Sequence, residues 1–185
     1  ISVAVGGILG ALIGLACGYL GGRFDLIVQR FVDAKQAIPG LVLALAIMAA
    51  LGSSLTNVII AISIGLVTSQ ARIVRSQALA VREMMYVEAA RGIGCSDFRI
   101  LFHHMLPNCI APFLIVTSAQ VGGAILTEAS LSFLGLGVPP PNPSWGAMLS
   151  GAAQQYVERA PWMAIFPGLA ITSVGFGFNL FGDAL

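Results

Sequence analysis

Titratable side chains that could carry out chemistry are concentrated in one stretch of the sequence, from Met84 to Pro107. They are Glu88, Arg91, Asp97, Arg99, His103 and His104. Acid–base catalysis or metal binding would need several of these groups to converge on one point. The two histidines are consecutive, so on a helix they point about 100° apart, and the chain has no other histidine. We therefore expect no metal site and no cofactor.

The sequence also lacks the short motifs that are typical of enzymes. It has no glycine-rich phosphate loop, so we expect that this chain does not itself bind ATP, and it has no HExxH metalloprotease motif. No serine in the long apolar segments has a partner side chain that could act as a base to activate its hydroxyl group. We predict no catalytic residue, and an intramembrane enzyme is a distant alternative.

The pattern of this stretch is that of a docking element. Ala89 and Ala90 favour a helix, Gly94 breaks it, and Ser96 followed by Asp97 is typical of a second helix start. The pattern predicts a short helix, a glycine turn and a second helix, presented at a membrane surface between two apolar segments. Such a shape suits contact with a partner protein.

The second helix of the stretch is expected to be amphipathic. Its apolar residues recur at the spacing of one helical face, and we expect this face to attach the stretch to the membrane spans. The face consists of Phe98, Leu101, Phe102 and Met105. Pro107 is expected to end the helix, because its ring opposes an unbroken continuation.

This stretch resembles the EAA loop of ABC importer permeases. The family pattern is Glu-Ala-Ala, three residues, Gly, nine residues and then Ile-x-Leu-Pro; His104 stands at the Ile position here, and the other anchors match. The resemblance implies coupling to an ATP-binding subunit through Glu88, Ala89, Ala90, Gly94, Leu106 and Pro107. We expect ATP hydrolysis in that separate subunit, so this chain is not expected to be an enzyme.

A second stretch, TEASLSFLGLGVPPPNPSWG from Thr127 to Gly146, resembles the second permease subunit of dipeptide and oligopeptide importers. The resemblance covers essentially the whole chain and implies a subunit that forms the translocation pathway for small peptides. The implied partners are two ATP-binding subunits, a second homologous permease, an extracytoplasmic solute-binding protein and membrane lipid, with no nucleic acid. Similar importers of nickel complexes or glutathione are the alternative.

Polar side chains within the fourth apolar segment suggest where a substrate would pass. Gln120, Thr127 and Ser130 share one side of a helix, and Glu128 lies on the adjacent side. Polar groups within a span usually face protein or a water-filled cavity. We expect these four residues to line the translocation pathway, with space left by Gly122-Gly123. Hydrogen bonding between helices is the alternative for the small hydroxyls.

The composition requires a membrane protein. Of the 185 residues, 57% are hydrophobic and 9% are charged, whereas a soluble domain carries about 25% charged residues. The net charge of +1 gives no indication of nucleic-acid binding. We expect residues 1–185 to be one domain, the transmembrane core of a permease without its N-terminal region and C-terminal tail.

The expected architecture is all-α: a polytopic transmembrane helical bundle of about five spans. Pro39 interrupts the second span, where a fixed kink or a hinge is expected. Glycines recur every fourth residue in the first span, which favours close helix packing. A tight polar turn is expected over residues 21–25 and a short helix over 147–159. The expected spans are Ile1–Leu20, Leu26–Leu51, Val58–Leu79, Cys109–Leu136 and Trp162–Phe181.

The distribution of positive charge predicts the orientation. With five spans, eight of the nine Lys and Arg residues fall on the side of the EAA-like loop, and Arg159 falls on the other. Cytoplasmic loops carry the excess of Lys and Arg. We therefore expect the loop in the cytoplasm of a bacterial or archaeal cell, in an inner-membrane protein. The proline-rich segment, residues 138–146, is expected outside. A channel or a scaffold would not need such a docking loop.

Overall fold

The computed structural model describes residues 1–156 and 158–184, and every regular element in these ranges is helical. This confirms the all-α prediction. The elements are α1 (Ser2–Leu20), α2 (Gly22–Gln36), α3 (Gly40–Leu51), α4 (Leu55–Arg82), α5 (Met85–Gly92), α6 (Asp97–Arg99), a π-helical segment (Ile100–Met105), α7 (Leu106–Phe133), α8 (Trp145–Gln155) and α9 (Trp162–Asp183).

Four helical segments are long and apolar enough to cross a membrane, namely α1, α4, α9 and the continuous segment Asp97–Phe133. A fifth span is available if α2 and α3 count as one, although they are bent by 84° at Pro39. The bend is sharp because proline interrupts the helical hydrogen bonds. The prediction of about five spans is therefore confirmed, and the second span is broken at the bend.

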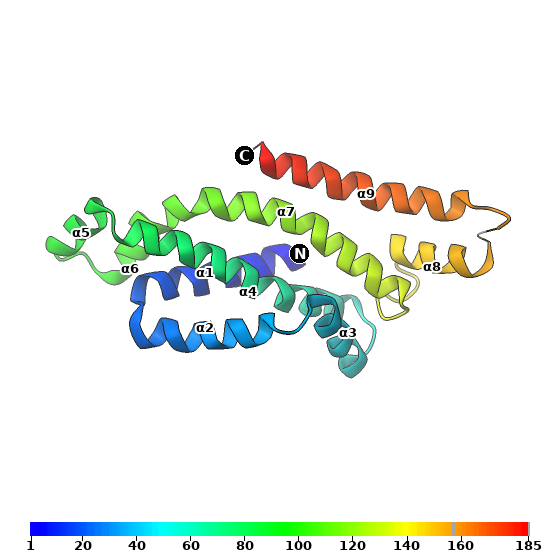
Figure 1. The fold of residues 1–185 in the computed structure, drawn as a ribbon, viewed down its shortest axis with the longest axis horizontal. Helices are drawn as coiled ribbons and strands as arrows, with labels where there is room; N and C mark the ends of the chain where they lie inside the picture. The colour runs from blue at the N-terminus through cyan, green and yellow to red at the C-terminus, as the bar shows by residue number, and fades with distance from the viewer. Residues whose placement is uncertain (157, 185) are drawn as a thin grey trace.

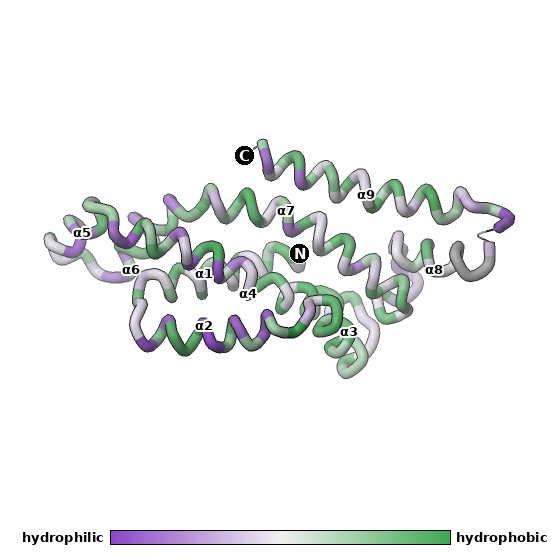
Figure 2. The backbone as a smooth tube through the Cα atoms, in the orientation of Figure 1, coloured by the Kyte–Doolittle hydropathy of each residue, from purple (hydrophilic) through white to green (hydrophobic). Residues whose placement is uncertain are grey.

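The long helices run roughly along the longest axis of the molecule, and α5 and α6 lie together at one end (Figure 1). The junction of α1 and α2 is at this end, while α3, α8 and the segment before α8 lie toward the other. Hydrophilic residues gather around α5 and α6 and alternate with hydrophobic ones along α2, whereas α3 and most of α9 are hydrophobic (Figure 2).

Helices α1 and α4 pack together through the row of glycines, as expected. A Cβ atom at Gly10 would lie 2.4 Å from the carbonyl oxygen of Val67, and one at Gly14 would lie 2.3 Å from that of Ala71. Real Cβ atoms do not approach so closely, so the two backbones touch only because these side chains are missing. The row stops at Gly18, because Gly22 begins α2 and no atom would meet its Cβ within 4 Å.

Helix α2 is attached to α4 by charged side chains, a pairing that the sequence alone did not predict. Arg75 makes two hydrogen bonds to the carboxylate of Asp25, and Arg72 Nη2 lies 2.6 Å from Asp33 Oδ1. Lys35 Nζ donates to the carbonyl oxygen of Gly65 at 2.6 Å. These contacts give the positive groups of α4 and α2 polar partners, which lowers the cost of placing them beside apolar segments.

Two expected turns differ from the structure. The turn predicted over residues 21–25 is Gly21 alone, at φ 63°, because α2 already begins at Gly22. The helix predicted over residues 147–159 is α8, Trp145–Gln155, and Val157 lies outside the described residues.

The expected open space at Gly122-Gly123 is only half correct. A Cβ at Gly122 would lie 3.2 Å from the carbonyl oxygen of Gly175, so α9 packs against α7 at this point. Gly123 faces open space, with no atom within 4 Å of a Cβ there. Gly122 therefore serves helix packing.

Replacement of Gly14 by alanine should destabilise the protein by about 1–3 kcal/mol, because the added methyl group overpacks the contact of α1 with α4. The matched control is Gly65→Ala in α4, where a Cβ meets no atom within 4 Å. Thermal unfolding in detergent should show a lower midpoint for Gly14→Ala and an unchanged or higher one for Gly65→Ala. Equal midpoints for the two variants would contradict this packing.

Candidate functional site

Helix α5 is buried on one side and exposed on the other. Val87 and Ala90, three residues apart, have 0% and 4% of their surface exposed. Glu88 and Ala89 between them are exposed. The Glu-Ala-Ala triplet therefore presents Glu88 and Ala89 outward, while Ala90 fixes the helix to the molecule.

The turn after α5 depends on the backbone conformation of Gly94. Its φ is 79°, a left-handed backbone conformation that residues other than glycine and asparagine rarely adopt. Its N–H donates to the carbonyl oxygen of Arg91 at 2.9 Å, and Cys95 N–H donates to that of Ala90 at 3.0 Å. A Cβ at Gly94 would meet no atom within 4 Å, so the constraint is conformation, not space.

The second helix of the loop starts as predicted but does not end at Pro107. Ser96 Oγ accepts a hydrogen bond from Arg99 N–H at 3.4 Å, as a helix N-cap does. The helix then changes to π-type hydrogen bonds over Ile100–Met105 and runs directly into α7. Pro107 lies in the first turn of α7, where a missing N–H is tolerated. The prediction that Pro107 closes the element is therefore wrong.

The predicted apolar face of this helix is also partly wrong. Met105 is buried and Leu101 packs against the core, but Phe98 is 71% exposed and Phe102 40%. Their rings contact each other, with centroids 4.4 Å apart. The π-helical hydrogen bonds shift the register by one residue per turn, so Ile100 takes the buried position.

The loop and the spans share one hydrophobic core. The core unites buried residues of α1, α4, α5, the π-helical segment and α7, namely Leu15, Tyr19, Val74, Ala78, Val81, Val87, Ala90, Ile100, Met105 and Cys109. The inner side of the loop is thus packed as firmly as the bundle itself. Because Cys17 and Cys109 are buried and no disulfide links the described cysteines, they act as small apolar residues.

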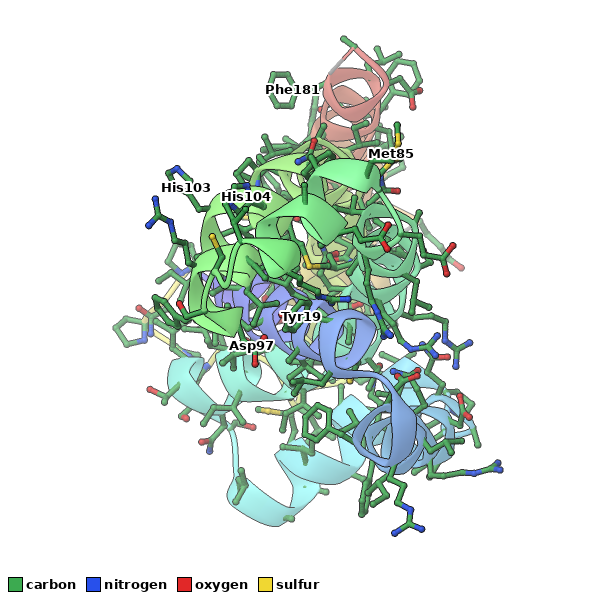
Figure 3. All side chains as sticks on the ribbon, turned by 90° about the vertical axis from the view of Figure 1, so that its left-hand side faces the viewer. Tyr19, Met85, Asp97, His103, His104 and Phe181 are labelled. Carbon is green, nitrogen blue, oxygen red and sulfur yellow. The ribbon has the colours of Figure 1, made fainter. Side chains whose placement is uncertain are left out.

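Tyr19 connects α1 directly to the loop, and sequence reasoning missed it. Its hydroxyl group donates to Asp97 Oδ1, and the guanidinium carbon of Arg91 lies 5.0 Å from the centroid of its ring. Tyr19 and Asp97 lie next to each other in the view onto this end of the molecule (Figure 3). The only signal in the sequence was a tyrosine at the end of an otherwise apolar span.

The outer surface of the loop carries large apolar side chains. The exposed fraction is 86% for Met85, 82% for Ile93 and 71% for Phe98. Glu88 adds an exposed carboxylate. The rings of His103 and His104 lie edge to face, with their centroids 5.7 Å apart. The described residues contain no group of His, Cys, Asp or Glu that could hold a metal ion.

The polar residues of α7 do not form one cluster. Gln120 Nε2 lies 3.5 Å from Ser69 Oγ of α4, and its buried Oε1 has no hydrogen-bond partner in the described part of the chain. The hydroxyl groups of Thr127 and Ser130 donate at 2.8 Å to carbonyl oxygens of their own helix. A further buried amide, Gln70 of α4, faces α7 and was missed.

Glu128 lies near the end of α7 that is remote from the loop. Its Oε1 accepts hydrogen bonds from Ser132 Oγ at 2.6 Å and from Ser144 Oγ at 2.9 Å. It also lines a cavity of about 600 Å³ between α7, the proline-rich segment and the start of α8. The structure therefore separates Glu128 from Gln120 and joins it to residues beyond α7.

Comparison with known proteins gives the family. A model of the family described as binding-protein-dependent transport system inner membrane component matches residues 10–185. The chain belongs to this family. It is therefore a multi-pass membrane protein of the permease type, and the resemblance inferred from the two motifs is confirmed.

Transport permeases from several bacteria are similar to this chain over nearly its whole length. A glutathione transport system permease (GsiD) of Pectobacterium atrosepticum is 45% identical over 184 residues, which are 100% of this chain and 61% of the relative. A dipeptide transport system permease (DppC) of Alkalihalophilus pseudofirmus is 44% identical over 96% of this chain and 58% of its own length. A probable D,D-dipeptide transport system permease (DdpC) of Escherichia coli K12 is 43% identical over 99% and 61%. The chain spans about three fifths of the length of these permeases.

Proposed function

We propose that this chain is a permease subunit of an ABC importer for small peptides and that α5 with its glycine turn docks onto an ATP-binding subunit. The observation that carries the proposal is the two-sided structure of the loop. Its inner side belongs to the core of the bundle through Val87 and Ala90, and its outer side exposes Met85, Ile93 and Glu88.

Exposed large apolar side chains in a polar surface favour protein contact, because their burial against a partner is favourable. The six residues of the motif then have separate tasks. Glu88 and Ala89 contact the partner, Ala90 fixes the helix, and Gly94 makes the turn. Leu106-Pro107 continues the loop into α7, so a displacement of the loop is passed to that span.

The expected assembly has two ATP-binding subunits, which hydrolyse ATP, and a second homologous permease. An extracytoplasmic solute-binding protein would contact the opposite end, near the proline-rich segment. The two ends of the elongated molecule fit these two kinds of partner (Figure 1). Alternating access then requires two conformations of similar energy, each favoured by one partner.

Small peptides are the substrate class that we favour, because relatives similar over nearly all of this chain carry peptide and dipeptide names. Glutathione is a second candidate on the same ground. We propose Gln120, Thr127, Ser130 and Glu128 for the pathway. Gln120 has an unused buried oxygen, and the two hydroxyl groups keep free lone pairs after donating to their own helix.

Charge reversal at Glu88 tests the docking role. Glu88→Lys should leave the subunit in the membrane and assembled, but lower substrate-stimulated ATP hydrolysis and peptide uptake severalfold. The reason is that the charge at the contact with the ATP-binding subunit changes from negative to positive. Glu83→Lys is the matched control, an exposed charge reversal just before α5. Gly94→Val should behave like Glu88→Lys and Gly94→Asn should be milder, because asparagine tolerates positive φ. Wild-type uptake and ATP hydrolysis in both Glu88→Lys and Gly94→Val would exclude the docking role.

Thiol labelling in intact cells tests the proposed orientation. With Cys95 replaced by serine, a cysteine at exposed Asn142 should react with a membrane-impermeant reagent added outside, whereas a cysteine at exposed Arg99 should react only after the membrane is opened. The reason is the excess of positive charge at the loop end. The reverse pattern would place the loop outside the cell and overturn the proposal.

A further inference from the structure

The cavity at Glu128 contains a carboxylate without a positive partner. Neither of the two ion pairs in the described part of the chain involves Glu128. No Lys or Arg is among the residues that line the cavity, whose walls are formed largely by Leu55, Val138, Pro143 and Trp145. A half-buried charge in such surroundings is costly unless something compensates it.

The carboxylate is held in a defined orientation. Both serine hydroxyl groups donate to Oε1, and no hydrogen bond among the described residues uses Oε2. Ser132 belongs to α7 and Ser144 to the segment before α8, so the carboxylate is fixed from two sides. One oxygen is committed to the protein and the other keeps its lone pairs for a ligand.

Close backbone contact fixes the opposite wall of the cavity. A Cβ at Gly146 would lie 2.2 Å from the carbonyl oxygen of Ala129, so the first turn of α8 rests directly on α7 beside Glu128. This contact positions Ser144 and Trp145, the two residues that precede Gly146. A second cavity, of about 340 Å³, also reaches Glu128 and Trp145. The two cavities share four lining residues, namely Leu55, Glu128, Val138 and Trp145.

We propose that this cavity binds the primary ammonium group of a peptide as it enters the pathway, with Glu128 supplying the negative charge. The inference rests on the proposed function as a peptide permease. An ammonium group offers three donors; the free Oε2 of Glu128 accepts one, and the side-chain oxygen of Asn142 is available for another, since its amide nitrogen donates to Pro139. The indole ring of Trp145 attracts a cation through its face.

The composition of the cavity favours an organic cation over a metal ion. Calcium takes six to eight oxygen ligands, whereas the side chains that line this cavity offer one carboxylate, one amide and one hydroxyl group among otherwise apolar residues. An ammonium group on a carbon chain matches both features. Free α-amino groups are common to peptides and glutathione, so the site suits either candidate substrate.

The proposal can be tested without relying on transport, by comparing how fast a cysteine in the cavity reacts with cationic and with anionic reagents. Met148 lines the cavity and is 54% exposed. In the assembled transporter, with Cys95 replaced by serine, Met148→Cys should react faster with a cationic thiosulfonate than with an anionic one. Glu128→Gln should lower this rate ratio by about tenfold, because it removes the nearby charge. The ratio at Met163→Cys should not change, because the neighbouring cavity that Met163 lines also touches Met148 but does not include Glu128.

Protection by ligand identifies the ammonium group. Millimolar glycylglycine should slow the labelling of Met148→Cys, N-acetylglycylglycine should not, and Glu128→Gln should abolish the difference. Ser144→Ala keeps the charge and should keep the cationic preference, which separates loss of charge from loss of fold. Equal protection by both peptides, or a rate ratio that does not change in Glu128→Gln, would overturn the ammonium site. Peptide uptake by the wild-type transporter is measured separately, and its absence would instead overturn the proposed function.

Discussion

The inner side of the EAA-like loop lies in the same hydrophobic core as three membrane helices. Val87 and Ala90 of α5 pack with Ile100 and Met105, and these contact side chains of α1 and α4. Protein cores are packed as densely as organic crystals and transmit displacement with little compression. A force on the outer side of the loop is therefore passed to the spans. The hydrogen bond from Tyr19 to Asp97 adds a polar connection to α1 at the same place.

The remaining contacts keep those spans together. Helices α1 and α4 approach until the backbones touch, because glycines leave no side chain between them. The carboxylates of α2 then pair with arginines that α4 would otherwise expose beside an apolar segment. Since α1 and α4 both reach the loop, α1, α2, α4 and the start of α7 form one connected body. Helix α9 contacts this body through α7, at Gly122 and Gly175.

Patterns of single residues predicted the fold well where local physics decides the structure. Apolar length predicted the spans, Ser96 predicted a helix start, and the left-handed turn falls on Gly94. Features that depend on tertiary contacts were missed: the pairs of α2 with α4, and the role of Tyr19. The π-helical segment moved Phe98 and Phe102 outward and Ile100 inward, a shift that a regular 3.6-residue period does not predict. Pro107 was misjudged because the hydrogen-bond register before it had already changed.

Because the loop and the spans share one core, they should move together. Two spin labels, at exposed Arg99 in the loop and exposed Leu12 in α1, would report the distance between them in the assembled transporter by pulsed electron paramagnetic resonance. Comparison of the nucleotide-free state with the ATP-trapped state is the most direct test. This distance should stay within about 2 Å between the two states, as for helices that shift as packed units. A change of about 5 Å, the size of a one-turn slip of one element past another, would contradict it.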